Sequence, residues 1–119
     1  RRQSASKRSF RNSRRKNDKS VIVRLDQKEK LALQYALDQI HADVYLFGSR
    51  VDDNKKGGDI DLLVLTDTNT INRLRLSQEI TRKFFSQCEQ KLDVAVFDKY
   101  KMTQEENAFF NSIKKIQIK

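Results

Sequence analysis

The sequence predicts a small α/β domain in which helices pack on a mixed β-sheet of about three to four strands. Two short apolar runs, at 44–47 and 62–65, have the length of buried strands. Residues 91–97 alternate between apolar and other side chains, which is typical of a third strand. Elsewhere apolar residues recur at helical spacing. The predicted order is therefore helix, strand, strand, helix, strand, helix.

The first half of the fold begins with a helix. Asp26 and Glu29 have the spacing of a capping box, and the apolar residues that follow at helical intervals are Leu33, Ala36, Leu37 and Ile40. A strand is expected at about 43–48 and a second one at 59–66. The loop at 50–58 between them is polar and ends in two glycines, which favour a turn.

The second half continues with a long helix at roughly 70–89. Its expected buried stripe consists of Ile71, Leu74, Ile80, Phe84, Phe85 and Cys88. After the strand at 91–97, Thr103 and Glu106 form a second capping box that predicts a last helix. The apolar stripe of that helix is expected to be Phe109, Phe110, Ile113 and Ile116. Residues 21–23 could add a short edge strand.

The charge of the chain is concentrated at its N-terminus. Residues 1–20 carry nine Lys or Arg against the single acid Asp18, whereas residues 21–119 hold 16 basic and 15 acidic residues. With Phe10 as its one large apolar residue, the segment 1–20 cannot bury enough surface to fold, so we predict a disordered tail and one domain at 21–119. Such a tail could bind nucleic acid non-specifically through phosphates.

The composition also bears on location. No apolar run approaches the ~20 residues of a membrane span, so we expect no membrane association, and the N-terminus lacks the apolar stretch of a secretory signal. Cys88 is the single cysteine, which excludes an internal disulfide and a multi-cysteine metal site. A reducing, cytoplasmic location is the expectation.

The residues that close the first strand and open the second one suit phosphate chemistry. Gly48 and Ser49 end the first strand, where a glycine and a small hydroxyl residue let backbone N–H groups approach phosphate oxygens. Asp59 and Asp61 lie two residues apart, so they point to the same face of a strand. Two carboxylates at ~4 Å repel by about 4 kcal/mol at an effective dielectric near 20. Magnesium held by carboxylates and substrate phosphates relieves that repulsion.

Asp93 adds a third carboxylate, between apolar residues of the strand at 91–97. A charge in that position is costly without a partner. If this strand lies beside 59–66, Asp93 joins Asp59 and Asp61, and we expect the three carboxylates within about 4–6 Å of one another. Three carboxylates suffice for two metal ions in phosphoryl transfer. The alternative is that Asp93 is a charge on the solvent face of an edge strand.

These residues resemble a known family. The segment Gly48-Ser49-Arg50, the polar loop, the run 59–64 that begins Asp59-Ile60-Asp61 and the later Asp93 look like the minimal nucleotidyltransferase (MNT) family of the DNA polymerase β-like nucleotidyltransferase superfamily. The resemblance covers about residues 25–119 and implies the nucleotidyltransferase fold. The chain departs from the family pattern in a loop one residue shorter than the commonest form, and in Gly58, where a serine usually precedes the first aspartate.

The resemblance implies a site and a reaction. Gly48 and Ser49 would bind the triphosphate of ATP, Arg50 could also touch the nucleotide, and Asp59, Asp61 and Asp93 would be the catalytic carboxylates that hold Mg²⁺. Members of the family often pair with a HEPN-type toxin as its antitoxin, and some transfer AMP from ATP to a tyrosine of the toxin.

Three functions therefore stay open from the sequence. The first is a magnesium-dependent nucleotidyltransferase that moves AMP onto an acceptor brought by a second protein. The second is a non-catalytic antitoxin or nucleotide-binding module that acts by contact alone. The third is a nucleic-acid-binding protein that acts through its basic tail.

Overall fold

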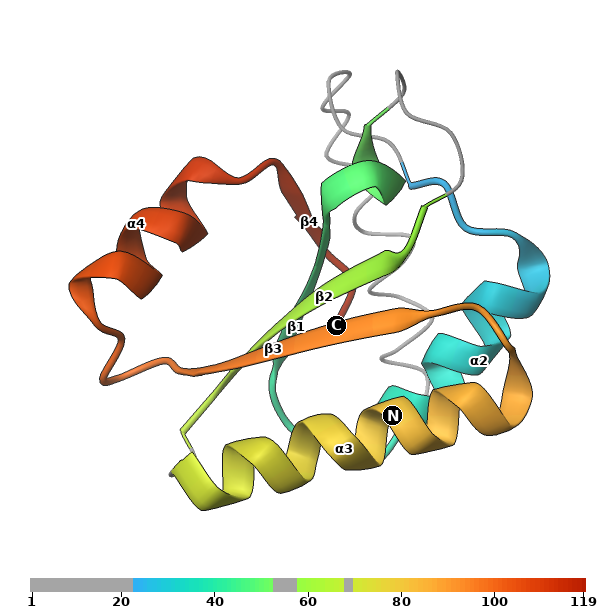
Figure 1. Ribbon diagram of the computed structural model, residues 1–119, viewed down its shortest axis with the longest axis horizontal. Coiled ribbons are helices and arrows are strands. Elements are labelled where there is room, and N and C mark those ends of the chain that lie inside the picture. The colour runs from blue at the N-terminus through green and yellow to red at the C-terminus, as the bar shows by residue number, and fades with distance from the viewer. Residues whose placement is uncertain (1–22, 53–57, 68–69) are drawn as a thin grey trace, which may run out of the picture.

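The computed structural model describes residues 23–52, 58–67 and 70–119. The predicted tail at 1–20 and most of the possible strand at 21–23 lie outside these residues. Within them the fold is a small mixed α/β arrangement, as predicted from the sequence. Four strands form one sheet in the order β3-β2-β1-β4. The helices α2 and α3 lie on one side of this sheet, and α4 lies on the other (Figure 1).

The central strands are close to their predicted positions. Strand β1 spans Asp43–Phe47 and β2 spans Ile60–Thr66, and the two run antiparallel, with Leu46 opposite Leu62. Strand β3 spans Leu92–Asp98 and runs parallel to β2 at the edge of the sheet. The prediction that the second and third strands are neighbours is confirmed.

Both predicted capping boxes are present. Helix α2 spans Gln27–Leu37, and the Asp26 carboxylate accepts the backbone N–H of Glu29 while the Glu29 carboxylate accepts that of Asp26. Helix α4 spans Gln104–Ser112, with the same reciprocal bonds between Thr103 and Glu106. Each box satisfies N–H groups that the first turn of a helix leaves without a partner.

The core lies between the sheet and the helices α2 and α3. Alternate strand residues point into it, and its largest fully buried side chains are Phe84, Leu33, Leu46, Ile60, Leu62, Ile80, Ile118, Val44, Val51 and Val64. Helix α3 spans Thr70–Gln87. Two members of its predicted buried stripe are in fact exposed, Leu74 by 62% and Phe85 by 57%. Phe84 takes the inward position, and adjacent residues of one helix cannot face the same way.

The predicted last helix is too long. Helix α4 ends at Ser112, and Lys115–Gln117 form a strand, β4, that pairs antiparallel with β1. Ile116 is therefore not part of a helical stripe, because it lies opposite Leu46 in the sheet. Phe109 and Phe110 pack edge-on against aromatic rings of the sheet, with centroids 5.5 Å from Phe47 and 5.2 Å from Tyr45.

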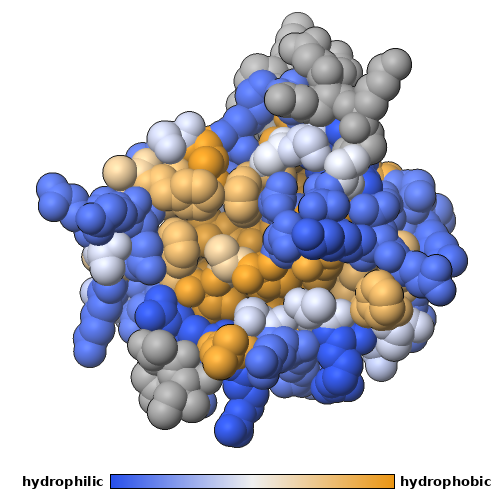
Figure 2. Space-filling view, viewed as in Figure 1, coloured by the Kyte–Doolittle hydropathy of each residue, from blue (hydrophilic) through white to orange (hydrophobic). Residues whose placement is uncertain are grey.

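Helix α4 lies on the face of the sheet opposite α2 and α3, and β3 forms an edge of the sheet. Apolar residues gather in the middle of the molecular face viewed in Figure 1, where β3 lies between α3 and α4 (Figure 2). Among the described residues, no helix combines the length and the apolar character that crossing a bilayer requires.

Candidate functional site

Asp61 and Asp93 lie side by side in the sheet. They are register partners on the parallel strands β2 and β3, so their side chains leave the same face. Phe47, the last residue of β1, is the partner of Asp61 on its other side. This is the face opposite the core, because Ile60 and Leu62, which flank Asp61, are completely buried on the helix side. Asp59 lies one residue before β2 begins.

The three aspartates interact electrostatically. The pKa of Asp61 is raised, first by burial and then by the negative charges of Asp93 and Asp59, while Lys91 opposes the shift. The ammonium of Lys91 lies 3.6 Å from Oδ2 of Asp59, but both side chains are about half exposed or more, so this pair contributes little stability. A cation beside Asp61 would relieve the repulsion that raises its pKa.

The carboxylates do not form the compact three-ligand cluster expected from the sequence. In the part of the chain that the structure describes, no three His, Cys, Asp or Glu side chains are arranged to hold a metal ion. Asp59 lies outside the strand, and its carboxylate is paired with Lys91. The donor set still fits magnesium, because Mg²⁺ is usually bound by one or two carboxylates plus substrate phosphates and waters. Asp61 and Asp93 supply two such carboxylates.

Gly48 brings the backbone of the loop against the Asp61 carboxylate. Its φ is +77°, a left-handed conformation that favours glycine, and a Cβ built on it would overlap Oδ2 of Asp61. Gly48 also begins the short 3-10 helix η2, Gly48–Val51, which contains Ser49. The first half of the predicted motif therefore touches the second half directly.

Gly58 has a similar reason to be glycine. Its φ is +88°, and a Cβ there would lie 2.5 Å from Oγ of Ser49. The Ser49 hydroxyl in turn donates a long hydrogen bond of 3.5 Å to the carbonyl of Asp59. Glycine at position 58 thus leaves room for the Ser49 hydroxyl.

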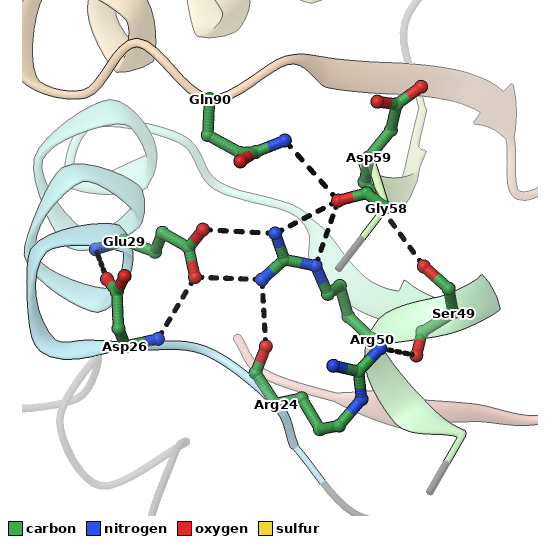
Figure 3. Close-up of polar contacts among 8 residues, drawn as sticks. All are labelled: Arg24, Asp26, Glu29, Ser49, Arg50, Gly58, Asp59 and Gln90. Atoms are coloured by element: carbon green, nitrogen blue, oxygen red, sulfur yellow. Dashed lines mark hydrogen bonds and ion pairs between the residues drawn. The ribbon is translucent and has the colours of Figure 1, made fainter. Parts of the chain in front are cut away.

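Arg50 is buried and hydrogen-bonded inside the protein. Its side chain is 7% exposed and forms an ion pair with Glu29, whose side chain is 8% exposed. Nε and Nη2 donate to the carbonyl of Gly58, Nη1 donates to the carbonyl of Arg24, and both Nη atoms donate to the Glu29 carboxylate (Figure 3). A guanidinium has five N–H donors, and these five bonds use them. A direct contact between Arg50 and nucleotide stays a prediction.

A pocket of about 290 Å³ opens beside Gly48 and Ser49. It is also lined by Phe47, Asp52, Ile113 and Lys114. Lys114 is exposed and lies in the turn between α4 and β4. Because β4 pairs with β1, this turn comes next to the end of β1, where the glycine loop begins.

The sequence reasoning missed Lys114 and the partners of Arg50. Lys114 is 65 positions from Ser49, and only the pairing of β4 with β1 brings them together. Glu29 was assigned to a helix cap alone, although its carboxylate also binds Arg50. The available signal was that Glu29 lies one helical turn before the apolar residues Ala32 and Leu33 on the inner side of α2, since a charge on that side needs a partner.

Comparison with known proteins agrees with this geometry. Residues 30–116 match the family described as polymerase beta, nucleotidyltransferase. Among curated proteins, none matches the chain. The matched segment covers most of the chain, from α2 to β4, and includes the glycine loop and all three aspartates. The chain belongs to the polymerase beta nucleotidyltransferase family, and its sheet and helices are consistent with the nucleotidyltransferase fold.

Proposed function

We propose that this nucleotidyltransferase domain transfers AMP from ATP, with magnesium, to a hydroxyl group of a second protein. The observation that carries the proposal is the juxtaposition of Asp61 and Asp93 in register on β2 and β3, with Gly48 directly against Asp61. A carboxylate pair next to a glycine loop is the arrangement that phosphoryl transfer needs, because the reaction requires both a place for phosphates and neutralisation of their charge.

The pocket beside the glycine loop is the site proposed for the triphosphate. Gly48 and Ser49 line one side of it, and the Lys114 ammonium comes from the turn on the other side. Asp52 also lines this pocket and would disfavour an anion close to it. We therefore assign the phosphates to the part of the pocket between Ser49 and Lys114.

The proposed reaction is an in-line displacement. The acceptor hydroxyl oxygen forms a bond to the α-phosphorus of ATP, the bond from that phosphorus to the oxygen bridging the β-phosphate breaks, and pyrophosphate leaves. Asp93 accepts the hydroxyl proton. Magnesium, which Asp61 and Asp93 would hold with Asp59 beside them, supplies positive charge to the phosphates. Lys114 neutralises part of the charge on the departing pyrophosphate.

The acceptor would come from outside this domain. Asp93 is exposed and belongs to an edge strand, so a loop or tail of another protein can reach it. The resemblance to the MNT family suggests a tyrosine of a HEPN-type toxin as this acceptor, and the chain would then be an antitoxin. AMP on the toxin would block it by bulk and by negative charge.

Intact-mass spectrometry of the partner tests this proposal. A HEPN-type protein encoded beside the chain is incubated with this protein, ATP and magnesium. We expect the mass of the partner to rise by one AMP, and this gain to disappear with Asp59→Asn or Asp61→Asn. Phe85→Ala, on the exposed side of α3, serves as a control variant that should transfer normally. Neutralisation of the partner without a mass change, by the wild type and by both aspartate variants, would instead show a module that acts by contact.

A further inference from the structure

One buried side chain joins the two halves of the phosphate motif. Arg50 belongs to η2, directly after Gly48 and Ser49, and its Nε and Nη2 atoms lie 3.1 and 3.0 Å from the carbonyl oxygen of Gly58. Gly58 is the residue before Asp59, and Asp61 follows two positions later. The same guanidinium therefore links the glycine loop to the start of the aspartate strand.

The other side of the guanidinium is fixed to helix α2. Nη1 and Nη2 donate to Oε1 and Oε2 of Glu29 at 2.8 and 3.0 Å, a two-pronged pairing that only an arginine can make. Glu29 is itself held, because its Oε1 accepts the backbone N–H of Asp26 in the capping box. The first turn of α2 thus serves as the anchor for the motif.

Further bonds close the arrangement. Nη1 of Arg50 donates to the Arg24 carbonyl, and the Arg24 side chain donates to the carbonyl of Ser49 at 2.6 Å (Figure 3). The Arg24 side chain also donates to the carbonyl of Asp52 at 3.1 Å. Gln90 adds a third donor to the Gly58 carbonyl, at 3.3 Å. We call the group formed by Glu29, Arg50 and Arg24 the loop clamp.

The bonds of the clamp are directed at the site. A buried ion pair contributes less to stability than well-packed apolar residues of similar volume often do. Its bonds go to backbone carbonyls on both sides of the site and not to the hydrophobic core. Groups behind a metal site that hold its ligands in place change metal affinity strongly, typically 10–100-fold when they are mutated.

We propose that Glu29 and Arg50 are positioning residues, which hold the Gly48–Ser49 loop and the segment 58–61 at the separation that the phosphates and the magnesium ion of a bound nucleotide require. This inference rests on the proposed nucleotide transfer and assigns Arg50 to a role behind the site. Loosening the clamp should therefore weaken magnesium-dependent ATP binding, and excess magnesium should restore it.

Arg50→Lys tests the clamp, because lysine keeps the charge but cannot reach both carbonyls and both carboxylate oxygens from one nitrogen. The matched control is Arg73→Lys. Arg73 also donates to a backbone carbonyl, that of Val96 at 3.3 Å, and lies 3.9 Å from a glutamate, Glu106, but it lies at the start of α3. If Arg50→Lys does not fold, Glu29→Gln replaces it, since the amide keeps the shape and loses the charge.

Two measurements are made on folded protein, well below the melting temperature of each variant. The first is the magnesium concentration at half-maximal ATP binding, which we expect to rise about 10–100-fold in Arg50→Lys and to stay unchanged in Arg73→Lys. The second is amide hydrogen exchange without nucleotide or metal. Peptides covering 48–52 and 58–60 should exchange faster in Arg50→Lys alone.

The outcomes separate this inference from the proposed function. If the wild type binds ATP with magnesium and Arg50→Lys has the same magnesium midpoint, the clamp is overturned and the proposed function stands. Equal shifts in Arg50→Lys and Arg73→Lys would also overturn it, as an effect of general destabilisation. If the wild type binds no ATP, the proposed function falls and the role in nucleotide binding falls with it. Amide hydrogen exchange would then still report whether the clamp holds the loop. Equal exchange in Arg50→Lys and Arg73→Lys would refute that part of the inference as well.

Discussion

Substituting Gly48 by alanine should damage both the fold and the nucleotide site. Gly48 has a φ of +77°, and an alanine in the left-handed region costs roughly 1–2 kcal/mol. For a domain of this size, about 1 kcal/mol lowers the melting temperature by about 4–8 °C, so we expect a loss of about 4–16 °C. The new Cβ would also overlap Oδ2 of Asp61, which must move.

Gly58→Ala separates these two effects. Its φ of +88° gives a similar backbone cost, but the Cβ would lie 2.5 Å from the Ser49 hydroxyl oxygen, which is the end of a side chain that can rotate away. Both variants should therefore melt at lower temperatures by similar amounts. Gly58→Ala moves the Ser49 hydroxyl and should lose some affinity for ATP, but Gly48→Ala should lose about tenfold or more beyond that in the affinity for ATP with magnesium, because it displaces a proposed metal ligand.

Thermal unfolding by circular dichroism and titration calorimetry with ATP and magnesium provide the two measurements. Calorimetry is done at a temperature where both variants are folded. Equal losses of affinity for ATP with magnesium in the two variants would refute the claim that a side chain at position 48 disturbs the site by displacing the Asp61 carboxylate. A Gly48→Ala protein that melts like the wild type would show that the left-handed conformation at this position is not required.

Three other predictions follow from single side chains. In metal-free buffer Asp61→Asn should be more stable than the wild type at pH 7. The stability that protonated Asp61 contributes is fully present below about pH 4 and is lost as the pH rises through its raised pKa. Urea unfolding should therefore show no difference between the two proteins near pH 3. Lys114→Ala should weaken the binding of ATP about two- to fivefold and hardly change the binding of AMP. Lys101 is also exposed, and Lys101→Ala should change the binding of neither nucleotide. Equal losses of affinity for AMP and ATP in Lys114→Ala would contradict the assignment of the phosphates to Lys114. In urea unfolding, Phe84→Ala should lower the free energy of unfolding by about 3–5 kcal/mol and Phe85→Ala by about 0.5 kcal/mol or less. Similar losses in the two variants would contradict the orientation of α3 in which Phe84 faces the core and Phe85 faces outward.

The features that the sequence predicted correctly are those set by short-range interactions. The capping boxes at Asp26 and Thr103 depend on bonds between residues three positions apart, so the spacing alone identifies them. The strands β1, β2 and β3 follow from short apolar or alternating runs next to turn residues. The third strand was expected to lie beside the second one if Asp93 was to join the other two aspartates, and β3 does pair with β2.

The features that were missed depend on residues far apart in the chain. The three residues of β4 become a strand because β1 has a free edge, and the spacing of Ile113 and Ile116 fits a helix equally well. Phe84 and Phe85 are both apolar, so the sequence could not show which of them the sheet would cover. The burial of Arg50 depends on Glu29, 21 positions earlier, whose role in a helix cap was sufficient to explain it.

Arg50 also shows why a motif residue need not touch the substrate. A flexible loop that binds phosphates must be held at a defined distance from the carboxylates, and an error of 1 Å can reduce the rate about 100-fold. The first turn of α2 supplies support for the loop through Glu29, whose carboxylate pairs with Arg50. The planar guanidinium suits this task because its five donors point in fixed directions and reach Glu29, Arg24 and Gly58 together. An arginine next to the glycine loop can therefore be required for nucleotide transfer while its charge stays paired inside the protein.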